Sequence, residues 1–292
     1  MLKDSGLTPE EKQQFANDGF FVVRDLLPRE DIQALVDDLE AQAERGVRAA
    51  VEARILDSAD CFEDAPFETR LAMVSDACTD KGWIWHEFFS VQKIRTPGMF
   101  TLRTSKPLLD VVESLIGPEI YAHPQYSFRA KMPDQHITVI PWHQDLAYLN
   151  PEEAGDTLVV NAWIPLVDAT VENGCMQVIR GSHQFDLIPH DHREEAPDHK
   201  GRRGIVEASL PDGDVFTAEL AVGDAMLTTE RLVHCSLPNV SNTVRWSVDT
   251  RYCRTGLPTG RESVPGFIAR SEDPSTVTPD LLAWNRLLEE GA

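Results

Sequence analysis

Residues 120–145 have the sequence IYAHPQYSFRAKMPDQHITVIPWHQD, and the texture of the chain changes at their start. From Ile120 onward, short runs rich in β-forming residues alternate with turn residues. Short strands joined by long connections favour a mainly β fold, here a double-sheet, cupin-like jelly roll. The expected strands are Tyr126–Lys131, Thr138–Trp142, Thr157–Pro165, Cys175–Ile179, Asp214–Glu219, Ala225–Thr229, Arg231–Cys235 and Thr243–Tyr252.

The segment before this change is mainly helical. Thr8-Pro9-Glu10-Glu11 has the residues of a capping box with proline in the first turn, and Gly19 suits the helix end. A short strand is expected at Phe20–Val23, followed by a helix at about residues 29–45 whose apolar side chains recur at helical spacing. Weaker helical patterns cover residues 66–77, 108–115 and 279–290.

No linker divides these regions, so we expect a single domain over residues 1–292. It comprises a mainly helical N-terminal region (1–118), a jelly-roll core (119–255) and a C-terminal extension (256–292). The polar stretch 186–213 is long enough to be a lid over a binding site.

The composition excludes several classes of partner. Lysine and arginine total 27 against 48 acidic residues, a formal net charge of −21, which repels nucleic acid and anionic membranes. Five cysteines without a CxxC pair favour neither a disulfide framework nor a structural zinc site. With no signal-peptide pattern and no long apolar run, the expected location is the cytoplasm.

A metal site is the strongest chemical prediction. In a strand, residues two apart point to the same side, so His143 and Asp145 would aim an imidazole and a carboxylate at one point. His234, in a later strand, would supply the third ligand. Two histidines and one carboxylate leave three positions open on the ion, as in non-haem iron(II) oxygenases.

Arg245 makes this interpretation more specific. The turn residues 238–242 separate it from His234, and a hairpin there would place Arg245 on the neighbouring strand. A guanidinium fork binds a carboxylate through two charge-assisted hydrogen bonds, which suits the distal carboxylate of 2-oxoglutarate.

At this point the chain resembles the phytanoyl-CoA dioxygenase family. The resemblance runs from about Gly19 to Tyr252 and implies a double-stranded β-helix with packed N-terminal helices. It also implies hydroxylation that depends on 2-oxoglutarate. The matching pieces are Asp18–Val23, Trp142–Asp145, Asn161–Trp163, Glu172–Cys175, Gly181–His183, Gly223-Asp224, His234–Ser236, Asn239, Ser241 and Arg245.

The resemblance assigns a role to each matching position. His143, Asp145 and His234 would bind Fe(2+), and Arg245 would bind 2-oxoglutarate. Trp163 and Ser236 would line and hold the same co-substrate. In one departure, Ser90 stands where the phytanoyl-CoA hydroxylases place a lysine before Val91-Gln92, which argues against a CoA-ester substrate.

Further residues are candidates from strand parity. Gln125, Arg129 and Lys131 share one side of the expected strand, and we include Gln125 among the co-substrate residues. Gln144 has the opposite parity to its neighbours and should point away from the metal.

The resulting hypothesis is an iron(II)- and 2-oxoglutarate-dependent dioxygenase that hydroxylates a small-molecule substrate with O2. A carboxylate at Asp145 favours hydroxylation, or a related desaturation, over halogenation, because halogenating relatives have a small residue there. Two alternatives are a cupin-like metalloenzyme that does not use 2-oxoglutarate and a non-catalytic jelly-roll binding protein.

Overall fold

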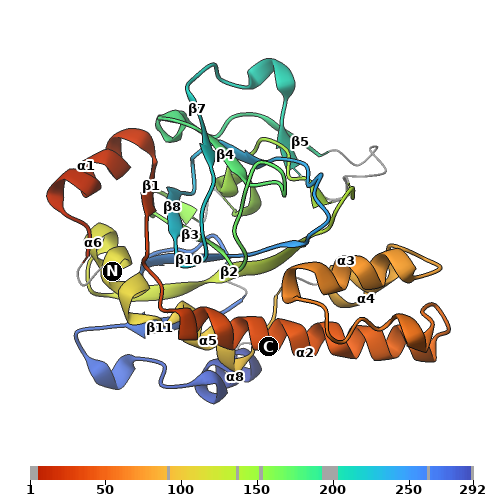
Figure 1. Ribbon diagram of the computed structural model, residues 1–292. Helices are drawn as coiled ribbons and strands as arrows, with labels where there is room; N and C mark the ends of the chain where they lie inside the picture. Colours follow the sequence, from red (N-terminus) through yellow and green to blue (C-terminus); the bar gives the residue numbers. More distant parts are fainter. Residues whose placement is uncertain are drawn as a thin grey trace.

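A computed structural model describes residues 6–90, 93–135, 138–150, 154–192, 203–261 and 264–290. Its strands form a large antiparallel sheet, a small antiparallel sheet and a two-stranded ribbon (Figure 1). The large sheet has the order β1 (Phe20–Val23), β8 (Ala225–Thr229), β3 (Val160–Pro165), β10 (Arg245–Arg254), β2 (Ile120–Lys131) and β11 (Phe267–Arg270). The small sheet has the order β7 (Val215–Ala218), β4 (Met176–Ile179) and β9 (His234–Ser236), and the ribbon pairs β5 (His190–His192) with β6 (Arg203–Ile205).

Helices cover one side of the large sheet, and the small sheet lies on its other side (Figure 1). The α-helices are α1 (Pro9–Asp18), α2 (Arg29–Glu52), α3 (Phe67–Ala77), α4 (Trp83–Phe88), α5 (Pro97–Arg103), α6 (Lys106–Ile116) and α8 (Leu281–Glu290). Short 3-10 helices occupy Ser58–Asp60, Asp145–Tyr148, Ser182–Gln184, Glu207–Ser209 and Pro274–Thr276.

The helical predictions are largely confirmed. Thr8 accepts a hydrogen bond from the backbone of Glu11 in a complete capping box, and α1 ends at Gly19 in the left-handed conformation. Helix α2 continues past the predicted end because Val47 and Ala50 extend its buried face. Helices α4 and α5 were not predicted.

The expectation of a mainly β fold is therefore corrected. Among the described residues, α-helices account for more of the chain than strands do, so the fold is a mixed one with two antiparallel sheets. The missed helices are short, and a periodic pattern is hard to detect over six or seven residues.

Alternation along β10 separates the core from the site. Trp246 and Val248 pack into the main hydrophobic core on the helical side, where Trp246 stacks on Phe67 with ring centroids 4.9 Å apart. Arg245 and Asp249, which have the opposite parity on the same strand, line a cavity that faces the small sheet. One strand thus anchors the helices with one side and presents polar groups with the other.

Two local predictions are wrong. Residues 138–142 do not form the expected strand; Pro141 has no N–H to donate to a ladder, and only an isolated bridge joins His143 to His234. The expected hairpin between His234 and Arg245 is also absent. Strand β9 pairs with β4, whereas β10 pairs with β2 and β3, so the turn at 238–242 crosses from the small sheet to the large one.

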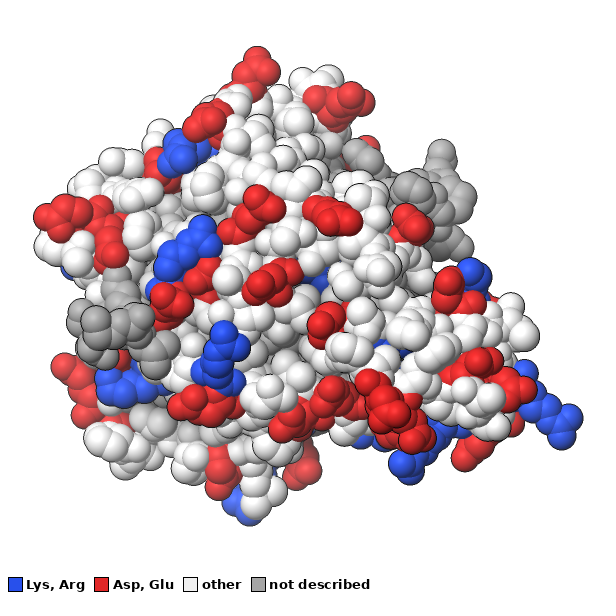
Figure 2. All heavy atoms as spheres, viewed as in Figure 1, with Lys and Arg blue, Asp and Glu red and all other residues white. Residues whose placement is uncertain are grey.

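The polar stretch 186–213 contains the β5–β6 ribbon, while residues 193–202 of the expected lid lie outside the described residues. Acidic side chains outnumber basic ones on the face shown in Figure 2, in line with the net charge. No helix in the described ranges has the length and apolar character needed to cross a membrane.

Candidate metal centre

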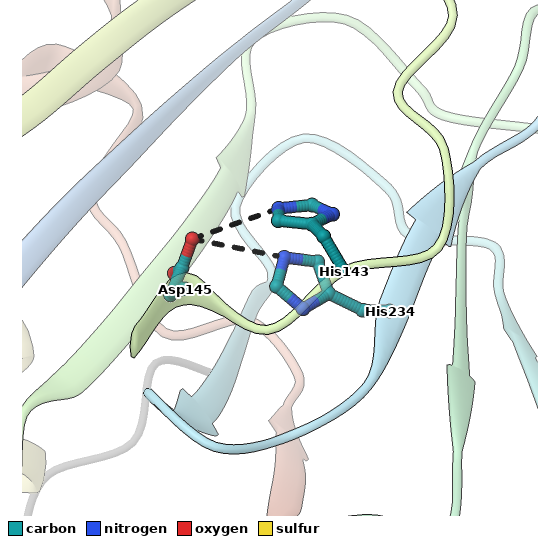
Figure 3. A group of neighbouring side chains, drawn as sticks. All are labelled: His143, Asp145 and His234. Carbon is teal, nitrogen blue, oxygen red and sulfur yellow. Dashed lines mark ion pairs between the residues drawn. The ribbon is translucent and has the colours of Figure 1, made fainter. Parts of the chain in front are cut away.

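His143, Asp145 and His234 converge on one point (Figure 3). The Oδ1 atom of Asp145 lies 3.7 Å from Nε2 of His143 and 4.0 Å from Nε2 of His234. The potential ligand atoms of all three lie within 4.8 Å of one another, and all three residues are buried. His143 reaches this point from the bridge to His234, and Asp145 from the start of the 3-10 helix that follows.

Backbone carbonyls fix the orientation of both imidazoles. Nδ1 of His143 lies 2.9 Å from the carbonyl oxygen of Pro141, and Nδ1 of His234 lies 2.9 Å from that of Leu232. Each Nδ1 therefore carries the hydrogen that it donates, and each Nε2 keeps a lone pair for a metal. Burial lowers the pKa of His234 to about 4, so its imidazole is neutral, the form that binds metal.

Asp145 is ionised and held by an arginine. Nη2 and Nε of Arg251 donate to its Oδ2 atom at 2.8 and 3.1 Å. Burial alone would raise the pKa of this carboxyl, but Arg251 and the two histidines hold it well below its usual range. A buried carboxylate paired in this way stays anionic.

These residues fit an iron(II) ion. Two imidazole nitrogens and one carboxylate oxygen are the facial donor set of non-haem iron oxygenases. Ligand atoms about 2.1 Å from one ion lie roughly 3 Å apart, so small side-chain rotations would close the present spacing.

A buried anion subsite adjoins the three ligands. Arg245 is 2% exposed, and no carboxylate in the described part of the chain forms an ion pair with it. Its guanidinium lies 5.4 Å from the ring centre of Trp163, and its Nε atom is buried without a hydrogen-bond partner. Burial lowers the pKa of Arg245 to about 10, so it remains a cation at neutral pH.

Lys131 lies directly across from Arg245 in the register of β2 and β10. Its Nζ donates to Oγ of Ser236 at 2.7 Å, and the backbone N–H of Ile140 donates to the same oxygen at 3.1 Å. Because Ser236 accepts two hydrogen bonds, its own hydroxyl hydrogen can be donated to an anion. Arg245 and the hydroxyl of Ser236 thus line the cavity, and the ammonium group of Lys131 lies against that hydroxyl, so a carboxylate bound there would meet positive charge.

The absence of a side chain at Gly174 leaves room for the side chain of Lys131. Its φ is +86°, and a Cβ there would lie 2.8 Å from Cε of Lys131 and 2.6 Å from the carbonyl oxygen of Leu237. Both the backbone conformation and the contact favour glycine.

A cavity lies in front of the triad, and all three of its residues line it. Arg129 lines it and pairs with Asp249 at 3.0 Å, and Asn161 presents a buried carbonyl oxygen with no hydrogen-bond partner. The described residues that line it are Arg129, Ile140, His143, Asp145, Asn161, Trp163, Met176, His234, Cys235, Ser236, Arg245, Asp249 and Arg251.

The structure brings together six of the seven site residues expected from sequence, namely His143, Asp145, Trp163, His234, Ser236 and Arg245. Gln125 is not among the described residues lining the cavity. The pairing of β10 with β2 shifts register between Thr250 and Tyr252, opposite this part of β2. Its contact with the co-substrate gains no support here and stays a prediction.

Gln144 points away from the metal, as predicted. Its side chain accepts from the backbone N–H of Ile188 at 2.8 Å and donates to the carbonyl oxygen of Arg231 at 2.8 Å. The backbone N–H of Gln144 donates to Nε2 of His190 at 3.0 Å. These hydrogen bonds connect the segment that leads into the β5–β6 ribbon to Gln144, which lies between His143 and Asp145 in the sequence.

Sequence reasoning missed Arg251 and Asp249. A signal was available, because Arg245, Ser247, Asp249 and Arg251 alternate with Trp246, Val248, Thr250 and Tyr252. In a strand this alternation places the four polar side chains on one side, opposite the side that packs in the core.

Comparisons with known proteins found similar chains. The phytanoyl-CoA dioxygenase (PhyH) family model matches residues 15–247. Human peroxisomal phytanoyl-CoA dioxygenase is 26% identical over 254 residues, covering 86% of this chain and 70% of that protein. L-proline trans-4-hydroxylase of Streptomyces griseoviridis is 29% identical over 183 residues, covering 57% of this chain and 67% of that protein. The solved structure of the non-heme monooxygenase ThoJ, in its apo form, has a similar fold, with a TM-score of 0.61, 21% identity and coverage of 96% and 94% of the two chains.

Proposed function

The chain belongs to the phytanoyl-CoA dioxygenase family of iron(II)- and 2-oxoglutarate-dependent oxygenases, and we propose that it hydroxylates an unactivated C–H bond of a small metabolite. The observation that carries this proposal is the juxtaposition of the His143–Asp145–His234 triad with the buried cation Arg245 in one cavity. A triad alone would fit any three-ligand metalloenzyme. A buried guanidinium without a carboxylate partner beside it requires an anion, and 2-oxoglutarate supplies one.

Iron and 2-oxoglutarate supply the oxidising chemistry when bound: O2, 2-oxoglutarate and R–H are converted to succinate, CO2 and R–OH. The chain supplies geometry and a dry cavity. The two Nε2 atoms are presented to the ion because the carbonyls of Pro141 and Leu232 hold the opposite nitrogens. Arg245, Lys131 and Ser236 would grip the distal carboxylate, and Trp163 would close the wall behind it.

One relative supports a small metabolite as substrate. L-proline trans-4-hydroxylase, a relative by sequence, acts on a small amino acid according to its name. Hydroxylation is favoured over halogenation because Asp145 occupies the position that chloride would need.

The experiment is a substrate screen that measures succinate release and oxidised product by the iron-loaded protein. Asp145→Ala should abolish product formation because the metal loses its anionic ligand, whereas Asp212→Ala, which changes an exposed carboxylate, should leave turnover intact. Substrate-coupled succinate release by the Asp145→Ala variant at the wild-type rate would contradict the assignment.

The same screen tests the two alternatives. Turnover without 2-oxoglutarate would favour a cupin-like metalloenzyme, for which Arg245 has no use. A protein that binds no stoichiometric iron, and whose melting temperature does not change with 2-oxoglutarate, would favour a non-catalytic binding protein.

The two facing sheets are proposed to form the family's double-stranded β-helix, with residues 1–292 as one oxygenase domain. In support, a single hydrophobic cluster joins the helices to the large sheet. A cytoplasmic location stays a prediction; the human relative is named as peroxisomal.

A further inference from the structure

The two oxygens of Asp145 have different surroundings. Oδ1 faces the two imidazoles, at 3.7 and 4.0 Å from their Nε2 atoms (Figure 3). Oδ2 accepts two N–H groups from Arg251, at 2.8 and 3.1 Å. Both side chains are 5% exposed, so water competes little for these hydrogen bonds.

The number of ligand oxygens decides what else the ion can hold. Two histidines and one carboxylate oxygen leave three positions on an octahedral ion, and 2-oxoglutarate and dioxygen need all three. If Asp145 bound through both oxygens, only two positions would remain, and 2-oxoglutarate would fill them. Dioxygen would then have no place to bind.

We propose that Arg251 is a positioning residue that keeps Asp145 a one-oxygen ligand, and so keeps a coordination position open for dioxygen. Arg251 does this by directing two N–H groups, from Nε and Nη2, at the single oxygen Oδ2; hydrogen bonds between oppositely charged groups are stronger than neutral ones. The inference rests on the proposed function of the same site.

Arg251 is itself held on its other side. Its Nη1 donates to Oδ2 of Asp249 at 3.1 Å, and Asp249 also accepts from Oγ of Ser127 at 2.7 Å and from Nε of Arg129 at 3.0 Å. The guanidinium therefore bridges two carboxylates and has little freedom to turn away from Asp145. Residues that support a metal ligand in this way tune both its orientation and its charge.

Three variants test the clamp, that is, the two hydrogen bonds from Arg251 to Oδ2 of Asp145, separately from the positive charge of Arg251. Arg254→Gln removes a cation at the exposed end of the same strand, leaves the hydrogen bonds between Arg251 and Asp145 in place, and is the matched control. Arg251→Lys keeps a cation but has a single nitrogen, which cannot serve both carboxylates. The double variant Arg251→Gln with Asp249→Asn removes one positive and one negative charge together, so no unpaired charge from the bridge remains buried.

Two readouts test the proposal without turnover. The first is the crystal structure of each variant with Mn(2+) and 2-oxoglutarate, which shows whether one or both oxygens of Asp145 bind the ion. The second is the anaerobic affinity of the Fe(2+)–2-oxoglutarate complex for nitric oxide, a stand-in for dioxygen, followed by electron paramagnetic resonance.

We expect two-oxygen binding by Asp145 and at least tenfold weaker nitric oxide binding in the double variant and in Arg251→Lys. Arg254→Gln should stay within threefold of the wild type. Circular dichroism identifies a variant that fails to fold; Arg251→Lys then decides alone. One-oxygen binding by Asp145, or unchanged nitric oxide affinity, in a folded variant without the clamp overturns the proposal.

The wild-type protein separates this inference from the proposed function. If the wild type fails to bind Fe(2+) through the triad, or binds it but not 2-oxoglutarate, the proposed function fails. If the wild type binds both and the variants without the clamp retain one-oxygen ligation, only the role of Arg251 is refuted.

Discussion

Replacing Arg245 with glutamine should selectively remove recognition of the distal carboxylate of 2-oxoglutarate. Arg245 is buried behind Trp163, so water cannot replace it. Glutamine approximates the length of the side chain but has no charge. The triad lies elsewhere in the cavity, and metal affinity should therefore change little.

The structure sets the size of the effect. One guanidinium nitrogen, Nη1, is engaged by the hydroxyl of Ser247, which leaves Nε and Nη2 for the ligand. Two charge-assisted hydrogen bonds contribute about 3–5 kcal/mol in total. Lys131 remains as a second cation beside the carboxylate, so we expect the lower end, about 3 kcal/mol, or roughly a 100-fold rise in Kd.

The assay is isothermal titration of the Mn(2+)-loaded protein with 2-oxoglutarate and with 2-oxopentanoate. The second ligand has the same chain length and the same metal-chelating end, with a methyl group in place of the distal carboxylate. The wild type should prefer 2-oxoglutarate strongly. In Arg245→Gln this preference should fall by about the same 100-fold factor, while the affinity for 2-oxopentanoate stays nearly constant.

Arg254→Gln is the control, since Arg254 lies at the exposed end of the same strand. It should preserve both affinities. If Arg245→Gln retains the wild-type preference for the diacid, or weakens both ligands equally, then Arg245 does not contact the distal carboxylate and the reasoning fails.

Two further predictions concern glycine strain and acid stability. Gly174→Ala and Gly256→Ala both place a side chain at positive φ, costing about 1 kcal/mol of unfolding free energy. Gly174→Ala costs more than Gly256→Ala, because its Cβ would also meet the carbonyl oxygen of Leu237. Only Gly174→Ala should also weaken 2-oxoglutarate binding, because its Cβ would displace Lys131, whereas a Cβ at Gly256 would meet open space. Equal affinities of the two variants for 2-oxoglutarate would exclude this role of Gly174. Burial lowers the pKa of His123 from 6.5 to about 4, so the stability it provides is present above pH 6.5 and is lost as pH falls towards 4. Urea unfolding measures the free energy of unfolding, which should fall less between pH 7 and pH 4.5 in His123→Gln than in the wild type, by about 2–3 kcal/mol. The same fall in both proteins would refute this.

Sequence could predict the elements whose signals are local. The capping box of α1 and the apolar run of β8, which follows Gly223-Asp224, were placed with their observed boundaries. The ligands were found because two histidines and a carboxylate in the family's order are specific. The geometry of these ligands was not predicted correctly, since His143 lies in an isolated bridge and Asp145 begins a 3-10 helix, where strand parity does not apply.

The sequence could not predict which strands pair when they lie far apart along the chain. Turn residues at 238–242 predict that the chain reverses there, but a local turn does not determine which sheet receives the next strand. The observed crossing places His234 and Arg245 on facing sheets across the cavity. This arrangement suits a co-substrate that spans from the metal to an anchor on the opposite wall.

The polar side of β10 divides into two halves with different charge balance. At one end Arg251 and Arg129 pair with Asp145 and Asp249, so cations and anions offset one another. At the other end Arg245 has no carboxylate partner among the described residues, and a buried cation of this kind costs folding free energy. An anionic co-substrate would supply the missing charge at that end alone. The balanced half can therefore hold the metal ligand rigidly with or without a co-substrate, while the unbalanced half gives a diacid a binding advantage that a neutral molecule cannot match.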